Sequence, residues 1–121
     1  AEQMPQAAAH LEQIAAIAMG MRRALEKQDW TEAARLLREE WSHRRKNCPT
    51  ITTPLIDRLI EVTRKAGARG AKVCGAGGGG CAVFLVEPGA KQRVSSLIAA
   101  EGAEVLDVKI APKGVRVKVA A

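Results

Sequence analysis

The chain has 121 residues, of which 47% are hydrophobic and 2% aromatic, and its formal net charge is +6. This length suits one core of modest size, so we expect residues 1–121 to form a single domain. The scarcity of aromatic side chains argues against modules that stack nucleic-acid bases, and most basic residues are interleaved with acidic ones as on solvated helix faces, so no nucleic-acid partner is expected.

Other bulk features argue against membrane and metal-binding classes. No apolar run reaches the ~18 residues that a membrane span requires, and the amino end lacks the basic-then-apolar pattern of a signal peptide. The cysteines Cys48, Cys74 and Cys81 form no C-x-x-C pair, which gives little support to a disulfide framework or a zinc ribbon. We therefore expect a soluble cytoplasmic protein with no membrane partner and no metal held by its side chains. The start at Ala1, within helical sequence, hints at a piece of a longer protein.

Three helices are predicted in the amino-terminal half. Apolar residues recur at helical intervals in the first, and Asp29 with Glu32 can form a capping box for a second helix that runs to about Arg45. Thr53 is the predicted N-cap of a third helix, with Pro54 at its first position. The predicted buried faces are Leu11, Ile14, Ala18, Met21 and Leu25 in the first helix, Trp30, Ala33, Leu37 and Trp41 in the second, and Leu55, Leu59, Ile60 and Ala66 in the third.

The periodicity changes after Gly67. Residues 71–74 and 81–86 are short apolar runs that predict two strands around a glycine loop, and a helix with Val94, Leu97 and Ile98 inside is expected to end at Gly102. Residues 104–110 and 115–119 predict two closing strands, the last with alternating Val and basic residues. This order predicts an α+β fold: a ferredoxin-like, mainly antiparallel four-stranded sheet with helices packed on one face and amino-terminal helices preceding it.

The segment Gly75-Ala76-Gly77-Gly78-Gly79-Gly80 is the most unusual feature of the chain. Five glycines in six positions cost backbone entropy, and they allow positive φ and a close approach of main-chain N–H groups to a phosphate. A tight turn or a close contact between packed backbones would explain them equally well. The pattern G-x-G-x-x-G lacks the helix that a dinucleotide site needs after it, because residues 81–86 are strand-like, and no Gly-Lys-Ser/Thr follows.

A wider window carries a family resemblance. Residues 66–81 read AGARGAKVCGAGGGGC, and this stretch resembles the third conserved motif of the galactokinase, homoserine kinase, mevalonate kinase and phosphomevalonate kinase (GHMP) superfamily. The Glu39-Glu40-Trp41 segment, the helix start at residues 54–59 and the turn at residues 112–115 resemble the sugar-kinase branch, particularly heptose-phosphate kinases. Cys81 at the end of the motif is more similar to the mevalonate kinases.

The resemblance implies the carboxy-terminal domain of an ATP-dependent kinase that phosphorylates a hydroxyl of a sugar or sugar phosphate. Residues 75–80 would lie beside the ATP phosphates, and Arg44, Arg45 and Lys46 would contact an anionic group of the acceptor. An amino-terminal domain in the same chain would supply the main phosphate loop, the catalytic residue and the Mg²⁺ ligands, so residues 1–121 alone are expected to be inactive. The alternative is a regulatory small-molecule-binding module with the same sheet and no catalysis; a large exposed apolar surface, left for a missing domain, would favour the kinase.

Overall fold

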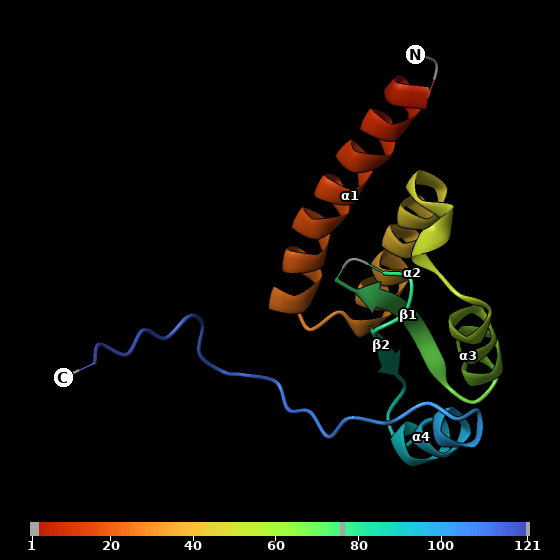
Figure 1. The fold of residues 1–121 in the computed structure, drawn as a ribbon. Helices are drawn as coiled ribbons and strands as arrows, with labels where there is room; N and C mark the ends of the chain where they lie inside the picture. Colours follow the sequence, from red (N-terminus) through yellow and green to blue (C-terminus); the bar gives the residue numbers. More distant parts are fainter. Residues whose placement is uncertain (1–2, 76, 121) are drawn as a thin grey trace.

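The computed structural model describes residues 3–75 and 77–120 as a mixed α and β structure (Figure 1). In chain order its elements are α1 (Gln3–Glu26), α2 (Trp30–Asn47), the 3-10 turn η1 (Pro49–Ile51), α3 (Pro54–Arg64), β1 (Ala68–Cys74), β2 (Cys81–Val86) and α4 (Lys91–Ala100). The long helix α1 lies beside α2, while α3 and α4 lie on the far side of the strands, and residues beyond α4 extend away from the rest (Figure 1).

The α1–α2 pair has its own small core. Ile17 and Ala24 of α1 pack with Ala33 and Leu36 of α2, and each of these residues is at most 6% exposed. Farther along the pair, the rings of His10 and His43 meet with their Nδ1 atoms 2.8 Å apart. Apolar burial at one end and a polar contact at the other therefore fix the alignment of the two helices.

The predicted buried face of α1 is only partly right. Ile14 and Met21 are partly buried as expected, but Leu11 and Leu25 are 59% and 48% exposed, and Ile17 is buried instead. Two sets of apolar residues, the predicted one and the buried one, run along this helix at three- and four-residue intervals. Both sets contain Ile14 and Met21, and their other members are offset from each other by one residue. One residue is a rotation of about 100°, so the contact with α2 decides which set is buried.

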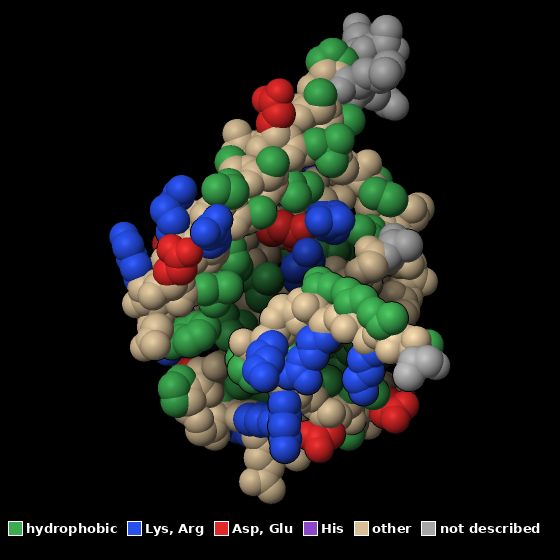
Figure 2. Space-filling model, turned by 90° about the vertical axis from the view of Figure 1, so that its left-hand side faces the viewer, with side chains coloured by type: hydrophobic (Ala, Val, Ile, Leu, Met, Phe, Trp, Pro, Cys, Tyr) green, Lys and Arg blue, Asp and Glu red, His purple; other side chains and the backbone are tan. Residues whose placement is uncertain are grey.

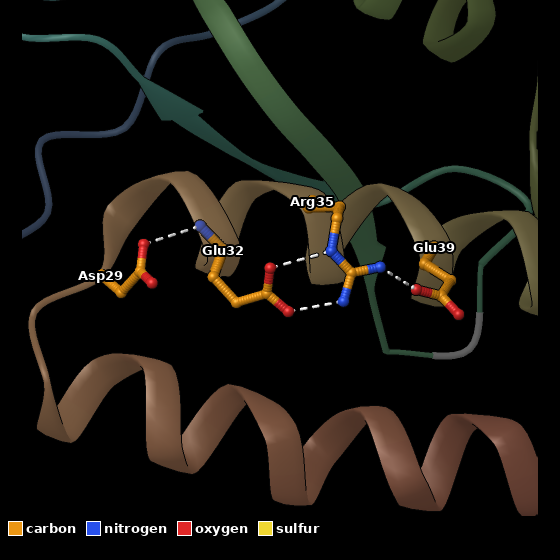
Figure 3. Close-up of polar contacts among 4 residues, drawn as sticks. All are labelled: Asp29, Glu32, Arg35 and Glu39. Atoms are coloured by element: carbon orange, nitrogen blue, oxygen red, sulfur yellow. Dashed lines mark hydrogen bonds and ion pairs between the residues drawn. The ribbon is translucent and has the colours of Figure 1, made fainter.

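The starts of α2 and α3 confirm the predicted caps. The Oδ1 atom of Asp29 accepts a hydrogen bond from the Glu32 amide at 3.1 Å, and the Thr53 hydroxyl accepts one from the Ile56 amide at 3.2 Å. The Glu32 carboxylate does not return to the cap but binds Arg35, which also contacts Glu39 (Figure 3). The hydrogen bond from Arg35 lowers the pKa of the Glu32 carboxyl, against a smaller opposing effect of desolvation.

The sheet consists of β1 and β2, paired antiparallel with Lys72 opposite Val83 and Cys74 opposite Cys81. Successive side chains of a strand point to opposite faces. Leu85 packs into the α1–α2 core, whereas its neighbours Phe84 and Val86 join α4 in a second core with Ala68, Ala90 and Val94. Helices therefore cover both faces of the sheet, and the prediction of helices on one face is wrong for α1 and α2.

The predicted four-stranded sheet is not present in the part of the chain that the structure describes. Residues 104–110 and 115–119 are extended, but neither pairs as a strand, and Val115 and Val119 are 97% and 89% exposed. Alternating β-branched residues suit a half-buried strand, but a strand also needs a neighbouring edge for its backbone hydrogen bonds. The pattern alone does not supply that partner.

A methyl group at Gly70 is expected to destabilise the contact between β1 and α2. A Cβ built on Gly70 would lie 2.9 Å from the Ala34 carbonyl oxygen and 3.3 Å from the Leu37 side chain. Because helix backbone cannot move aside cheaply, Gly70→Ala should lower the free energy of unfolding by about 1 to 2 kcal/mol in urea denaturation. The control is Gly114→Ala, where a built Cβ meets nothing within 4 Å. Equal stability of the two variants would contradict the close contact.

Candidate functional site: the glycine loop and the ion cluster beside it

The glycine loop joins β1 to β2 along a path that only glycine follows easily. The φ angles of Gly75, Gly77, Gly78, Gly79 and Gly80 are 79°, 85°, 73°, 134° and 80°. Side chains with a Cβ rarely adopt positive φ, so these residues are required by the backbone conformation itself. Ala76, the sixth predicted residue of the loop, lies outside the described residues.

The middle of the loop is docked on the turn η1. The Gly78 amide donates a hydrogen bond to the Ile51 carbonyl oxygen at 2.8 Å, and a Cβ on Gly77 would lie 2.1 Å from Ile51 Cγ1. Ile51 is itself buried with Trp41 and Val73. Gly77 therefore matches the alternative in which glycine permits close packing of two backbones, and the Gly78 amide already has a protein acceptor.

The rest of the loop is open. A Cβ built on Gly75, Gly79 or Gly80 would meet nothing within 4 Å. These three glycines have positive φ, but no neighbouring atom lies close enough to exclude a side chain at their positions. The arrangement leaves room for a ligand beside the backbone, which is the feature that a phosphate-binding glycine loop needs.

A buried carboxylate lies beside the same strand. Glu40 of α2 is 7% exposed, and its Oε1 atom accepts hydrogen bonds from Lys72 Nζ of β1 at 3.0 Å and from Arg44 Nε at 2.8 Å. Its Oε2 atom is buried and has no hydrogen-bond partner among the described residues. Figure 2 shows acidic and basic side chains meeting in a hollow beneath the long helix. We call Glu40, Arg44 and Lys72 the ion cluster.

The ion cluster was not predicted as a unit. Arg44 follows Glu40 by four residues, which is a helix-face spacing visible in the sequence, but Lys72 is 32 residues away and reaches Glu40 only because β1 packs on α2. Because Glu40 of α2 accepts a hydrogen bond from Lys72 of β1, the cluster ties the strand that leads into the glycine loop to α2.

The three basic residues predicted to bind the acceptor do not converge on one point. Arg44 binds Glu40, and Arg45 Nη2 lies 3.6 Å from Asp57 Oδ1 of α3. Lys46 is exposed and forms no ion pair with any residue in 3–75 or 77–120. All three lie in the last turn of α2, where positive charge also favours the helix dipole.

Two surface hollows lie elsewhere. Their volumes are about 550 and 510 Å³, the first lies along α3 and the second between α3 and α4, and both are lined by charged and apolar side chains. None of the predicted site residues lines either one. Their open shape and charged rims provide no convergent set of polar groups for a ligand.

Two further features concern metals and membranes. Within residues 3–75 and 77–120, His, Cys, Asp and Glu side chains nowhere gather in threes in a way that could hold a metal ion. Among the described helices, none combines the length and apolar character needed to cross a bilayer.

Comparison with known proteins identifies the family. The profile described as "GHMP kinases C terminal" matches residues 21–104, which include α2, both strands, the glycine loop and α4. Mevalonate kinases from Pyrococcus abyssi and Thermococcus onnurineus are each 35% identical over 68 residues, and that from Pyrococcus furiosus is 32% identical over the same length. The matched segment covers 56% of this chain and 20% of each relative. The profile spans more than half of the chain, and the chain therefore belongs to the GHMP kinase C-terminal domain family.

Proposed function

We propose that the whole protein is a cytoplasmic kinase that transfers the γ-phosphoryl group of ATP to a hydroxyl of a small-molecule acceptor, and that this chain supplies one wall of its active site. The family match carries the proposal, because the matched relatives are kinases by name. The open glycines at 75, 79 and 80 support it, since phosphoryl transfer depends on positioning and charge stabilisation that backbone groups can provide.

The open glycines fit a nucleotide phosphate. A Cβ built on Gly79 or Gly80 would meet no atom within 4 Å, which leaves room for a bulky anion beside the backbone. Mg²⁺ in phosphoryl-transfer sites is usually held by one or two carboxylates together with the substrate phosphates. From the family match we propose that the Mg²⁺ ligands, the main phosphate loop and the catalytic residue come from an amino-terminal domain of the same polypeptide.

Exposed apolar surface supports the presence of that second domain. Leu11 and Met19 on α1 are 59% and 54% exposed, and hydrophobic side chains are visible along the length of this helix (Figure 2). Isolated domains rarely present so many large apolar side chains, whereas a domain that packs against a neighbour does.

We also propose that residues 104–110 and 115–119 pair with the sheet in the whole protein and complete the four-stranded antiparallel arrangement. Val115, Val117 and Val119 alternate with Arg116 and Lys118, the pattern of a strand with one buried face. Among the described residues the sheet contains only β1 and β2, so each strand has one edge that is free to pair with another strand.

The acceptor is proposed to carry an anionic group. The sequence resemblance points to a sugar phosphate, while the matched relatives are named mevalonate kinases, whose substrate carries a carboxylate. Arg44, Arg45 and Lys46 lie at the end of α2, just before the turn η1 on which the glycine loop is docked. Positive charge beside the loop would attract either acceptor.

Loss of this positive charge is expected to weaken acceptor binding. In the full-length enzyme, Arg44→Ala combined with Arg45→Ala should raise KM for the anionic acceptor at least tenfold, about 1.4 kcal/mol, with KM for ATP unchanged. Steady-state kinetics with a heptose phosphate and with mevalonate would measure this and identify the acceptor class. The control is Arg45→Ala alone, which leaves the ion cluster intact. Unchanged Michaelis constants in the double variant would mean that these basic residues only interact favourably with the helix dipole and do not bind the acceptor.

The 121-residue chain by itself is expected to show no kinase activity and only weak binding of Mg-ATP, because one wall of the site is present. Isothermal calorimetry with Mg-ATP is the measurement. Binding in the low-micromolar range by the isolated chain would contradict the proposal and favour the alternative, a regulatory small-molecule-binding module. Activity in the full-length protein, lost when the amino-terminal domain is removed, would support the kinase.

A further inference from the structure

Two cysteines face each other at the base of the glycine loop. Cys74 is the last residue of β1, Cys81 is the first residue of β2, and they are direct partners in the antiparallel register. Both carry free thiols and both are exposed. Residues directly opposite each other in an antiparallel pair have their side chains on the same face, so the two thiols are neighbours on one side of the sheet.

The strand pairing sets a spacing that suits a disulfide. Directly opposite residues in antiparallel strands have Cα atoms about 4.5 or 5.5 Å apart, depending on the kind of pair. Disulfide-bonded cysteines have Cα atoms about 4.4 to 6.8 Å apart. The backbone therefore needs no rearrangement for a bond to form, and pairing with β2 has already closed the eight-residue span from Cys74 to Cys81.

We propose that Cys74 and Cys81 form a reversible redox pair that closes a disulfide across the base of the glycine loop. The oxidant is a low-molecular-weight disulfide such as oxidised glutathione. One cysteine thiolate attacks a sulfur of that disulfide and releases one glutathione thiolate. The second cysteine then attacks the mixed disulfide at the protein sulfur and releases the second. One external disulfide is thus reduced to two glutathione thiols, two cysteine thiols are oxidised to one disulfide, and the two cysteine protons end on the released glutathione thiolates.

The third cysteine is not part of the pair. The Sγ atom of Cys48 contacts the Thr50 hydroxyl at 3.4 Å, in the turn that precedes α3. No group of three metal-ligating side chains forms in the described part of the chain, so the thiols do not gather as a site for zinc or another thiophilic ion. Cys48 is also exposed and serves as an internal control for general thiol reactivity.

The bond would restrict the motion of the loop. Its covalent link would prevent the two strand ends from separating, while Gly79 and Gly80, which have no close neighbours, depend on those ends for their position. Oxidation should therefore reduce phosphoryl transfer reversibly. This consequence depends on the proposed function, whereas formation of the disulfide does not. In a reducing compartment such a bond would be transient and redox-sensing.

Tryptic digestion separates the possible products. Cleavage after Lys72 and Lys91 places both Cys74 and Cys81 in the single peptide 73–91, while Cys48 falls in the peptide 47–58. The full-length protein would be equilibrated with reduced and oxidised glutathione, quenched with an alkylating reagent, digested and analysed by mass spectrometry. We expect peptide 73–91 to lose the mass of two hydrogen atoms and to escape alkylation, and dithiothreitol to reverse both changes.

Matched variants make the result decisive. With Cys74→Ser, the remaining Cys81 should be trapped as a mixed disulfide with glutathione, and with Cys48→Ser the internal disulfide should form as in the unaltered protein. Addition of two glutathiones to peptide 73–91, or a cross-link between peptides 47–58 and 73–91, would overturn the proposal. In an active enzyme, oxidation should lower kcat/KM at least fivefold, and Cys74→Ser should remove that sensitivity. An inactive reduced protein would count against the proposed function alone, because the mass change is read without activity.

Discussion

Valine in place of Gly78 is expected to lower kcat/KM of the full-length kinase at least ~100-fold, or about 2.7 kcal/mol of transition-state stabilisation. Gly78 has a φ of 73°, which a β-branched residue adopts only with strain. Its amide donates a hydrogen bond to the Ile51 carbonyl oxygen and so anchors the loop. A changed backbone conformation at this residue would therefore displace the neighbouring Gly79 and Gly80. A small displacement of groups around a transferring phosphoryl is costly because the reaction depends on positioning.

The loss of folding stability in Gly78→Val should be smaller than the loss of transition-state stabilisation. A Cβ on Gly78 would have the Thr50 carbonyl oxygen at 3.8 Å as its nearest neighbour, an ordinary contact, so the main cost is backbone strain of about 1 to 2 kcal/mol. Gly77→Ala is the comparison, since its Cβ would collide with Ile51 and should reduce thermal stability and activity together. If Gly78→Val lost stability as Gly77→Ala does and retained activity in its folded fraction, the loop would be a structural turn.

Removal of the buried carboxylate in Glu40→Ala is expected to lower the free energy of unfolding by about 3 kcal/mol. Breaking a buried ion pair by deleting one partner leaves uncompensated charge and commonly costs 3 to 5 kcal/mol. Here two cations lose their shared acceptor, but the side chains of Lys72 and Arg44 are 23% and 31% exposed and can turn partly toward water. The lower end of the range therefore applies, and urea denaturation measures it.

An exposed pair provides the control for this effect. Arg22 and Glu26 form an ion pair on α1 with side chains 72% and 62% exposed, and Glu26→Ala should change stability by no more than about 0.5 kcal/mol. Glu40→Gln keeps the shape and one acceptor oxygen, and should fall between the two. Equal stabilities for Glu40→Ala and Glu26→Ala would mean that the ion cluster does not hold β1 against α2.

The glycine loop could be located from the sequence, but the separate roles of its glycines could not. The sequence predicted positive φ and offered two explanations, a ligand cradle and a close backbone contact. The structure assigns the second explanation to Gly77, which lies against Ile51, and leaves open space at Gly79 and Gly80. A composition pattern cannot separate these cases, because every glycine in the run has the same conformational freedom and only the neighbouring turn distinguishes them.

The sequence by itself determined the features that depend on adjacent residues. The caps at Asp29 and Thr53, the change from helix to strand after Gly67 and the span Cys81–Val86 follow from hydrogen bonds and side-chain periods within a few positions.

Only the tertiary structure decided the features that join distant residues. It selected Ile17 over Leu11 for burial, brought Lys72 to Glu40 across 32 positions, and left residues 104–119 without a strand partner. A local pattern fixes which side chains share a face of an element, whereas the neighbour that this face meets is set by packing between elements far apart in the chain.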